Sequence, residues 1–171
     1  MALLIARVIN YAIMQGAIEE PAALEDPGFT DIGALGQEAQ DAIALLYTLG
    51  VTKGTTATNY SPAASVTRRD MASFLVRTQN LIEEGSYDTE GWFFTDVTTE
   101  LDRAADVNAL AAQGIFVGSG DQTYRPFDPV LRSQMALYLM RFLDENVEAG
   151  RLPAMGRSGD RQKEPGFISA A

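Results

Sequence analysis

The chain of 171 residues contains no cysteine and no histidine, and it has 13 basic residues against 23 acidic ones. Without cysteine there is no disulfide framework, no thiolate nucleophile and no thiolate-bound metal. Without histidine there is no Ser-His-Asp triad and no zinc-hydrolase motif. The net charge of -10 also disfavours nucleic acid as a partner, because phosphate binding needs clustered Lys and Arg. A carboxylate-based enzyme, a binding module and a structural protein remain.

Long apolar runs are also missing, so we expect no membrane insertion. The apolar start lacks a basic region before it and has Arg7 within it, which argues against a signal peptide. Its apolar residues fall at helical spacing, so residues 1–20 are predicted to contain an amphipathic helix. The segment 149–171 is rich in Gly, Pro and small polar residues and is predicted to be a flexible tail or linker.

Short motifs occur twice in the same order. They are Phe-Thr-Asp at 29–31 and 94–96, Gly50 and Gly114, Gly54 and Gly118, Tyr-x-Pro at 60–62 and 124–126, Arg68 and Arg132, Met-Ala at 71–72 and 135–136, and Arg77 and Arg141. Met1-Ala2 followed by Arg7 fits the end of the same pattern. The sequence therefore contains two full repeats, at 29–84 and 94–148, preceded by the last helix of another.

Each repeat has the pattern of a helix, a long loop and a second helix, so the fold class is mainly all-α. The first helices are predicted over 37–49 and 101–113, and each ends before a glycine suited to the left-handed conformation. The second helices are predicted to run from about Thr67 to Glu84 and from Leu131 to Glu148, with Thr67 as an N-cap. No single unit could bury its apolar faces alone, so the repeats must pack on one another.

These ordered motifs resemble the S-layer homology (SLH) domain family. The stretch from Gly118 to Ala136, with its Gly-Asp-Gln-Thr-Tyr-Arg-Pro sequence, is especially similar to it. The resemblance implies helix–loop–helix repeats around a central helical bundle in a pseudo-threefold arrangement. It also implies a non-catalytic cell-envelope anchor, located extracellularly at a bacterial cell wall or S-layer. Such a module binds secondary cell-wall polysaccharide, often anionic and pyruvylated, in grooves between repeats, without a cofactor.

Candidate ligand-binding residues follow from that resemblance and from the residues themselves. An Arg at a helix start, beside unpaired backbone N–H groups, is a suitable receptor for a sugar carboxylate. The alternative for this Arg is an ion pair with the Asp of the Phe-Thr-Asp motif. The glycines have an alternative role in turns, and the only tryptophan has one in packing. The candidates are Arg68, Arg132, Asp31, Asp96, Gly54, Gly118 and Trp92. No catalytic residue and no metal ligand is predicted.

The sequence departs from the family pattern in three respects. The first repeat is represented only by its last helix, which favours a fragment, a wrongly assigned start or self-association that completes the repeat. The family's Thr-Arg-Ala-Glu motif stands here as Thr-Arg-Arg-Asp at 67–70 and as Leu-Arg-Ser-Gln at 131–134. No second functional domain is visible. An assembly protein that uses these repeats for protein–protein contacts, without glycan binding, is therefore the alternative. An Arg that is open in a groove favours an anchor, and an Arg that is buried in an ion pair favours assembly.

Overall fold

The described residues, 1–85, 87 and 91–154 of a computed structural model, contain five α-helices and no β-strand. The helices are α1 (Ala2–Met14), α2 (Gln37–Thr48), α3 (Arg68–Ile82), α4 (Ala104–Ala112) and α5 (Arg132–Glu148). The mainly all-α fold class is thereby confirmed. The helix predicted over 101–113 begins later, at Ala104, because Arg103 has a left-handed backbone conformation with φ 68°.

Helix ends follow the local signals in the sequence. The Thr67 hydroxyl accepts a hydrogen bond from the Asp70 N–H and caps α3. At α5, where Leu131 cannot act as a cap, the Gln134 side chain accepts the Leu131 N–H at 3.0 Å instead. Gly50 and Gly114 both follow a first helix and both have a positive φ, of 71° and 68°. Glycine adopts this conformation at little cost, so the chain can turn sharply after each first helix.

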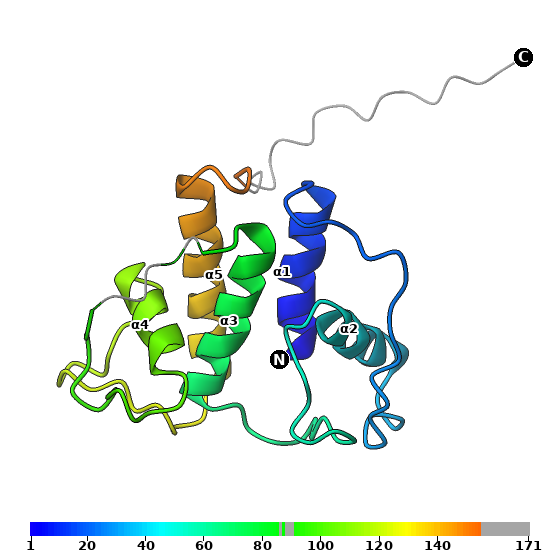
Figure 1. Cartoon of the computed structure of the whole chain (residues 1–171), viewed down its shortest axis with the longest axis horizontal. Helices are drawn as coiled ribbons and strands as arrows, with labels where there is room; N and C mark the ends of the chain where they lie inside the picture. The colour runs from blue at the N-terminus through cyan, green and yellow to red at the C-terminus, as the bar shows by residue number, and fades with distance from the viewer. Residues whose placement is uncertain (86, 88–90, 155–171) are drawn as a thin grey trace, which may run out of the picture.

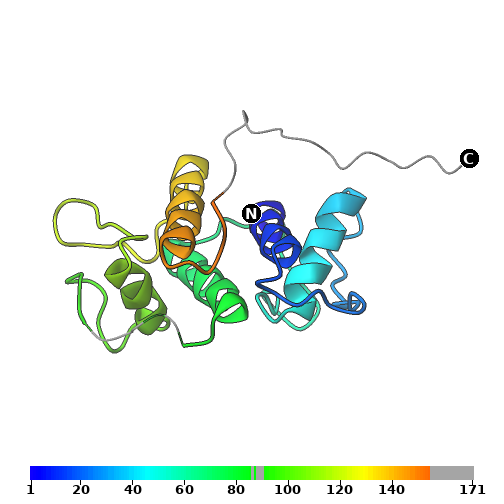
Figure 2. The ribbon, with the colours of Figure 1, turned by 90° about the horizontal axis from the view of Figure 1, so that it is seen from above.

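Four of the helices form two pairs, and each pair joins helices from successive repeats. Helix α2 packs against α1, and α4 packs against α3. Figures 1 and 2 show both pairs, with α1, α3 and α5 as the longer, steeply inclined helices in the first view. The first helix of a repeat therefore covers the second helix of the repeat before it.

One continuous core joins these elements. Buried apolar side chains of all five helices belong to it. Near the C-terminal ends of both helices, the Asn146 side chain of α5 donates to the Gln79 side chain of α3 at 2.8 Å. Because both groups are buried, this bond ties the two second helices together where water cannot compete.

Phe29 and Phe94, at the start of the two repeats, pack against the tyrosine of the Tyr-x-Pro motif. Phe29 is buried and has ring contacts with Tyr47 and Tyr60, at 5.7 Å and 5.8 Å between centroids. Phe94 likewise contacts Tyr124 at 5.2 Å. These contacts explain why the Phe-Thr-Asp and Tyr-x-Pro motifs recur together in the sequence.

The start of the predicted tail is packed onto the helices. Leu152 is buried, and Arg151 forms ion pairs with Glu83 and Glu145. The Tyr11 hydroxyl donates to the Pro153 carbonyl at 2.8 Å. Residues 151–153 therefore pack against the helices, and a flexible tail or linker over 149–171 stays a prediction. Residues 155–171 lie outside the described part of the chain.

Gly54, in the loop between α2 and α3, has a steric role that can be tested. A Cβ at Gly54 would lie 2.5 Å from the Phe29 ring and 2.7 Å from the Asn59 carbonyl oxygen, at a φ of +77°. We expect Gly54→Ala to lower the free energy of unfolding by about 2 kcal/mol, because strain and overpacking add. Urea denaturation measures this change in the free energy of unfolding. Gly33→Ala, where a Cβ meets nothing within 4 Å, is the control and is expected to change little.

Candidate functional site

The start of α3, which the sequence suggested as an anion receptor, is already bonded to the second repeat. The N–H of Arg68 donates to the Asp128 carbonyl at 2.9 Å, and that of Arg69 donates to the Pro126 carbonyl at 3.0 Å. The N–H of Asp70 binds the Thr67 hydroxyl. These N–H groups are therefore not open to a ligand, which corrects the expectation of a free helix N-terminus.

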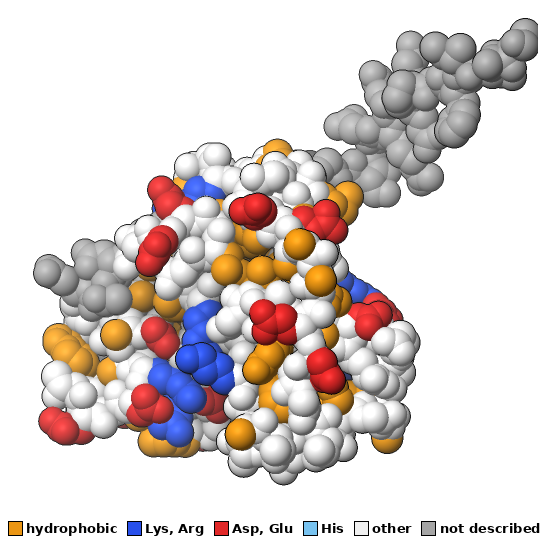
Figure 3. All heavy atoms as spheres, turned by 45° about the vertical axis from the view of Figure 1, so that its right-hand side comes forward, with side chains coloured by type: hydrophobic (Ala, Val, Ile, Leu, Met, Phe, Trp, Pro, Cys, Tyr) orange, Lys and Arg blue, Asp and Glu red, His pale blue; other side chains and the backbone are white. Residues whose placement is uncertain are grey.

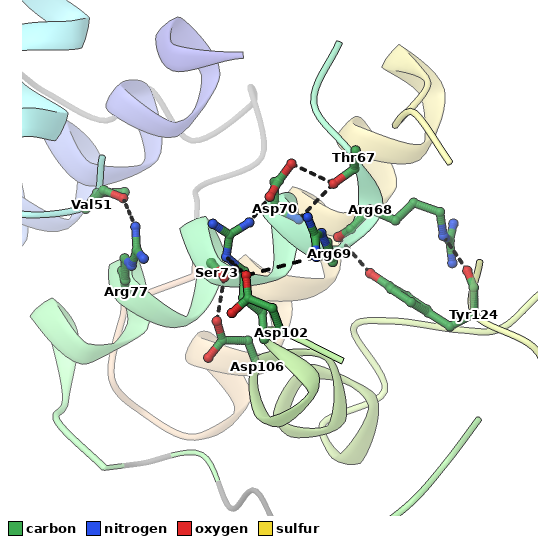
Figure 4. Close-up of polar contacts among 11 residues, drawn as sticks. Val51, Thr67, Arg68, Arg69, Asp70, Ser73, Arg77, Asp102, Asp106 and Tyr124 are labelled. Carbon is green, nitrogen blue, oxygen red and sulfur yellow. Dashed lines mark hydrogen bonds and ion pairs between the residues drawn. The ribbon is translucent and has the colours of Figure 1, made fainter. Parts of the chain in front are cut away.

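The side chain of Arg68 points into the second repeat and is only 5% exposed. Its guanidinium donates to the carbonyls of Tyr124 (2.7 Å) and Val117 (3.3 Å) and to the Tyr138 hydroxyl (2.5 Å). It also lies 4.4 Å from the centroid of the Tyr124 ring, in cation–π geometry. Figure 4 shows Arg68 and Tyr124 on the opposite side of the helix from Arg77. The expectation that Arg68 lies open in a groove is wrong.

The ion-pair alternative for Arg68 is also wrong. None of the ion pairs among the described residues includes Arg68. Backbone carbonyls and a hydroxyl accept hydrogen bonds from its guanidinium instead, and the Tyr124 ring lies against it. Burial of the same cluster raises the pKa of the Tyr124 phenol far above its usual range. Arg68 is therefore a structural link between repeats, whereas Arg132, which holds the same position in α5, is exposed.

The aspartates of the two Phe-Thr-Asp motifs hold the Tyr-x-Pro loops. Asp31 accepts the N–H groups of Tyr60 and Ser61 at 2.9 Å and 2.7 Å. Asp96 accepts those of Tyr124 and Arg125 at 2.7 Å and 2.8 Å. The bond from the Tyr60 N–H is the main cause that lowers the pKa of Asp31. The structure gives both carboxylates a role in shaping the loops.

The remaining predicted residues divide between packing and exposure. Gly118, like Gly54, has no room for a Cβ, which would lie 2.7 Å from the Thr123 carbonyl oxygen and 2.8 Å from the Phe94 ring. Trp92 is 58% exposed. It does not line the cavity described below. The structure thus does not bring the seven predicted residues together in one site.

A cavity of about 600 Å³ lies between the start of α1 and the repeat 29–84. Its walls come from the start of α1, from α2, from the loop between α2 and α3, and from α3, and Arg103 of the repeat 94–148 also lines it. Apolar groups such as Ile43 and Phe74 and polar groups such as Thr55 and Ser61 line it together. Four cationic side chains and one acidic side chain also line it: Lys53, Arg69, Arg77, Arg103 and Asp70. Of the seven candidate residues predicted from the sequence, only Gly54 lines this cavity.

We call this cavity the inter-repeat cavity. Its cationic side chains have different partners. Arg103 forms an ion pair with Asp70 and lies 3.6 Å from Asp102. Arg69 lies 4.0 Å from Asp102 and 4.8 Å from the Phe127 ring centroid. The buried Nε of Arg69 has no hydrogen-bond partner among the described residues. Figure 3 shows Lys and Arg side chains gathered over a hollowed part of one face, with acidic groups around them.

Sequence reasoning did not identify these cations as a group. Arg69 follows the candidate Arg68 directly, and Arg103 stands in the first turn of the helix predicted over 101–113. Their signal is the doubled Arg at 68–69: successive residues of a helix point in different directions, so one faces the second repeat and the other faces the cavity. Arg77 donates to the Val51 carbonyl at 3.1 Å, as Arg141 does to that of Ile115, so this repeated Arg fixes a loop.

The comparison with known families identifies the repeats. Residues 28–72 and 93–136 match the S-layer homology domain family, and together they make up about half of the chain. The chain therefore belongs to the S-layer homology domain family. None of the helices in the described ranges has the length and apolar character needed to cross a membrane.

Curated relatives include large polysaccharide-degrading enzymes. The chain is 30% identical over 118 residues to exoglucanase XynX of Acetivibrio thermocellus and 32% identical over 118 residues to amylopullulanase of Thermoanaerobacterium thermosulfurigenes. It is 34% identical over 97 residues to endo-1,4-beta-xylanase A of Thermoanaerobacterium saccharolyticum. The matches cover 65%, 65% and 57% of this chain but only 10%, 6% and 8% of those proteins. The similarity thus concerns a small part of each enzyme.

The two equivalent arginines give a matched test of the structural role. We expect Arg68→Ala to lower the free energy of unfolding by about 3 kcal/mol, because buried carbonyl and hydroxyl groups lose their donor. Arg132→Ala is expected to change it by no more than about 0.5 kcal/mol, because that side chain is exposed. Chemical denaturation of both variants measures the difference. Equal, small effects would contradict the role assigned to Arg68.

Proposed function

We propose that this chain is a non-catalytic cell-envelope anchoring module that binds an anionic, pyruvylated secondary cell-wall polysaccharide in the inter-repeat cavity. Membership of the SLH family supports the anchoring role. The location that goes with it is extracellular, at a bacterial cell wall. The observation that carries the finer proposal is the gathering of four cations and one acid in one cavity of a chain whose net charge is -10.

The chemistry of the cavity suits a sugar that carries a carboxylate. A pyruvate ketal presents one carboxylate beside an apolar methyl group and a sugar ring. The Arg69 side chain is partly exposed, and a guanidinium binds a carboxylate through parallel hydrogen bonds. The apolar floor and the hydroxyl groups of Thr55 and Ser61 match the two faces of a sugar. The proposed site therefore uses Arg69 and Arg103 in place of Arg68.

The remaining candidates from the sequence have different places in this proposal. Gly54 lines the cavity and shapes the loop beside it. Asp31 acts indirectly, since it holds Tyr60 and Ser61, which line the cavity. Arg132 and Trp92 lie on exposed surface and are proposed as contacts only for a polymer long enough to leave the cavity.

Wall binding tests the proposal directly. We expect the chain to co-sediment with sacculi that carry pyruvylated polymer and to stay in solution with sacculi stripped of it. The double variant Arg69→Ala/Arg103→Ala is expected to bind at least about tenfold more weakly, because two charge-assisted contacts are lost. Arg125→Ala removes an exposed Arg outside the cavity and is the control. Equal pelleting with native and stripped sacculi, or equal loss in the control, would contradict the proposal.

Salt dependence distinguishes a local site from general attraction. An acidic chain and an acidic polymer repel each other at long range, whereas the contacts within the cavity are short. Raising the salt concentration from about 10 to about 100 mM shortens the screening length from about 30 to about 10 Å. We expect the bound fraction in the sedimentation assay to rise over this range. A steady decline would indicate attraction by net charge and would argue against this picture.

A further inference from the structure

Arg103 reaches the inter-repeat cavity from an unusual backbone conformation. It stands directly before α4 with φ 68° and ψ 21°, in the left-handed region that residues other than glycine seldom adopt. Its side chain makes no capping hydrogen bond to the helix that it precedes. A strained conformation persists only where the surroundings hold it, so the contacts of the Arg103 side chain are the place to look for its role.

The Asp70 carboxylate holds the Arg103 guanidinium in an ion pair, which joins a residue of the first full repeat to a residue of the second. One oxygen of this carboxylate also accepts the Thr67 hydroxyl at 2.6 Å, so Asp70 is fixed at the start of α3 (Figure 4). Both members of the ion pair line the cavity, and about a third of each side chain is exposed. Asp102 lies 3.6 Å from the Nε of Arg103, but it is outside the cavity lining. A solute in the cavity can therefore reach the ion pair.

Asp70 presents the same chemical group as the proposed ligand, a carboxylate. A guanidinium binds a carboxylate through two parallel hydrogen bonds, and two carboxylates cannot accept from the same pair of N–H groups. The other cations of the cavity differ from Arg103 in this respect. Arg77 donates to a neutral carbonyl, and the acidic neighbour of Arg69 does not line the cavity. Among the described residues of the lining, Arg103 is thus the cation whose acidic partner stands inside the cavity.

We propose that Asp70 is a built-in competitor, which limits the affinity of the inter-repeat cavity for anions by occupying Arg103 when no ligand is bound. This inference rests on the proposed function, because it names a residue that regulates the same site. A bound carboxylate takes over the Arg103 guanidinium and releases Asp70, which keeps the Thr67 hydroxyl as a partner. Binding therefore exchanges one ion pair for another, so each contact of a polymer with the cavity is weak and readily reversed.

Removal of the Asp70 charge tests the competition. The probe is pyruvylated methyl glucoside, and isothermal titration calorimetry measures its binding to the full chain. Asp70→Asn retains an oxygen that can accept the Thr67 hydroxyl but lacks the charge that holds Arg103. We expect this variant to bind the probe at least about fivefold more tightly than the unaltered chain, because Arg103 is free for the ligand. Asp70→Ser also lacks the charge and is expected to change the affinity in the same direction, and circular dichroism verifies that both variants are folded.

Asp106→Asn is the matched control for net charge. The Asp106 carboxylate accepts the Ser73 hydroxyl at 2.5 Å and does not line the cavity. This variant loses the same charge in the same part of the molecule, so only the long-range repulsion between the chain and the probe is reduced. We expect its affinity to rise by less than about twofold. Equal gains in Asp70→Asn and Asp106→Asn would assign the effect to net charge and would overturn the proposal.

A double-mutant cycle shows whether the gain passes through Arg103. A competitor has nothing to compete for once the guanidinium is absent. We therefore expect Arg103→Ala to weaken binding of the probe, and the double variant Asp70→Asn/Arg103→Ala to bind no more tightly than Arg103→Ala alone. A fivefold gain that persists without Arg103 would overturn the proposal. Methyl glucoside without pyruvate is the uncharged probe, and a gain in its binding to Asp70→Asn would indicate a reshaped cavity and would overturn the proposal as well.

The same titrations separate this inference from the proposed function. If the unaltered chain binds the pyruvylated probe and Asp70→Asn binds it equally or more weakly, Asp70 orients Arg103 for the ligand or has no part in binding. That result overturns the competition and leaves the anionic site in place. If neither chain binds the probe, both proposals are overturned. Tighter binding by Asp70→Asn that requires Arg103 and the pyruvate group supports both.

Discussion

The covering of each second helix by the first helix of the next repeat is the contact on which this structure depends. A single helix–loop–helix unit has an apolar stripe on both helices but no partner within itself. Packing α2 on α1 and α4 on α3 removes those stripes from water. The burial of Arg68 in the next repeat fixes the register of this contact, since a guanidinium with three acceptors tolerates little displacement.

That contact also explains why the repeated motifs are as they are. Asp31 and Asp96 each fix a loop through two backbone N–H groups. The glycines at 54 and 118 let the loop backbone approach the Phe ring beneath it. These motif residues shape the surfaces that successive repeats present to one another. These motifs therefore recur because folding requires them, and any ligand site uses the surfaces that they shape.

The inter-repeat cavity is a consequence of the same arrangement. Side chains of α3 and of the α4 start bring Arg69, Arg77 and Arg103 to one cavity. This surface has the chemistry of an anion site.

The sequence by itself determined the repeats, their helices and their family, because these depend on local spacing and on motifs that recur in order. The N-cap at Thr67 and the left-handed glycines at 50 and 114 were predictable for the same reason. The start of α4 was not, because Arg103 takes a left-handed conformation that no residue type demands.

Only the tertiary structure decided which arginine is buried and which is exposed. Arg68 and Arg69 are neighbours of the same type, yet one is enclosed by the second repeat and the other lines the cavity. Arg68 and Arg132 hold the same motif position, yet the second repeat encloses Arg68 whereas Arg132 is exposed. The sequence specifies the chemistry of a side chain, whereas its burial depends on which segment, distant along the chain, packs against it.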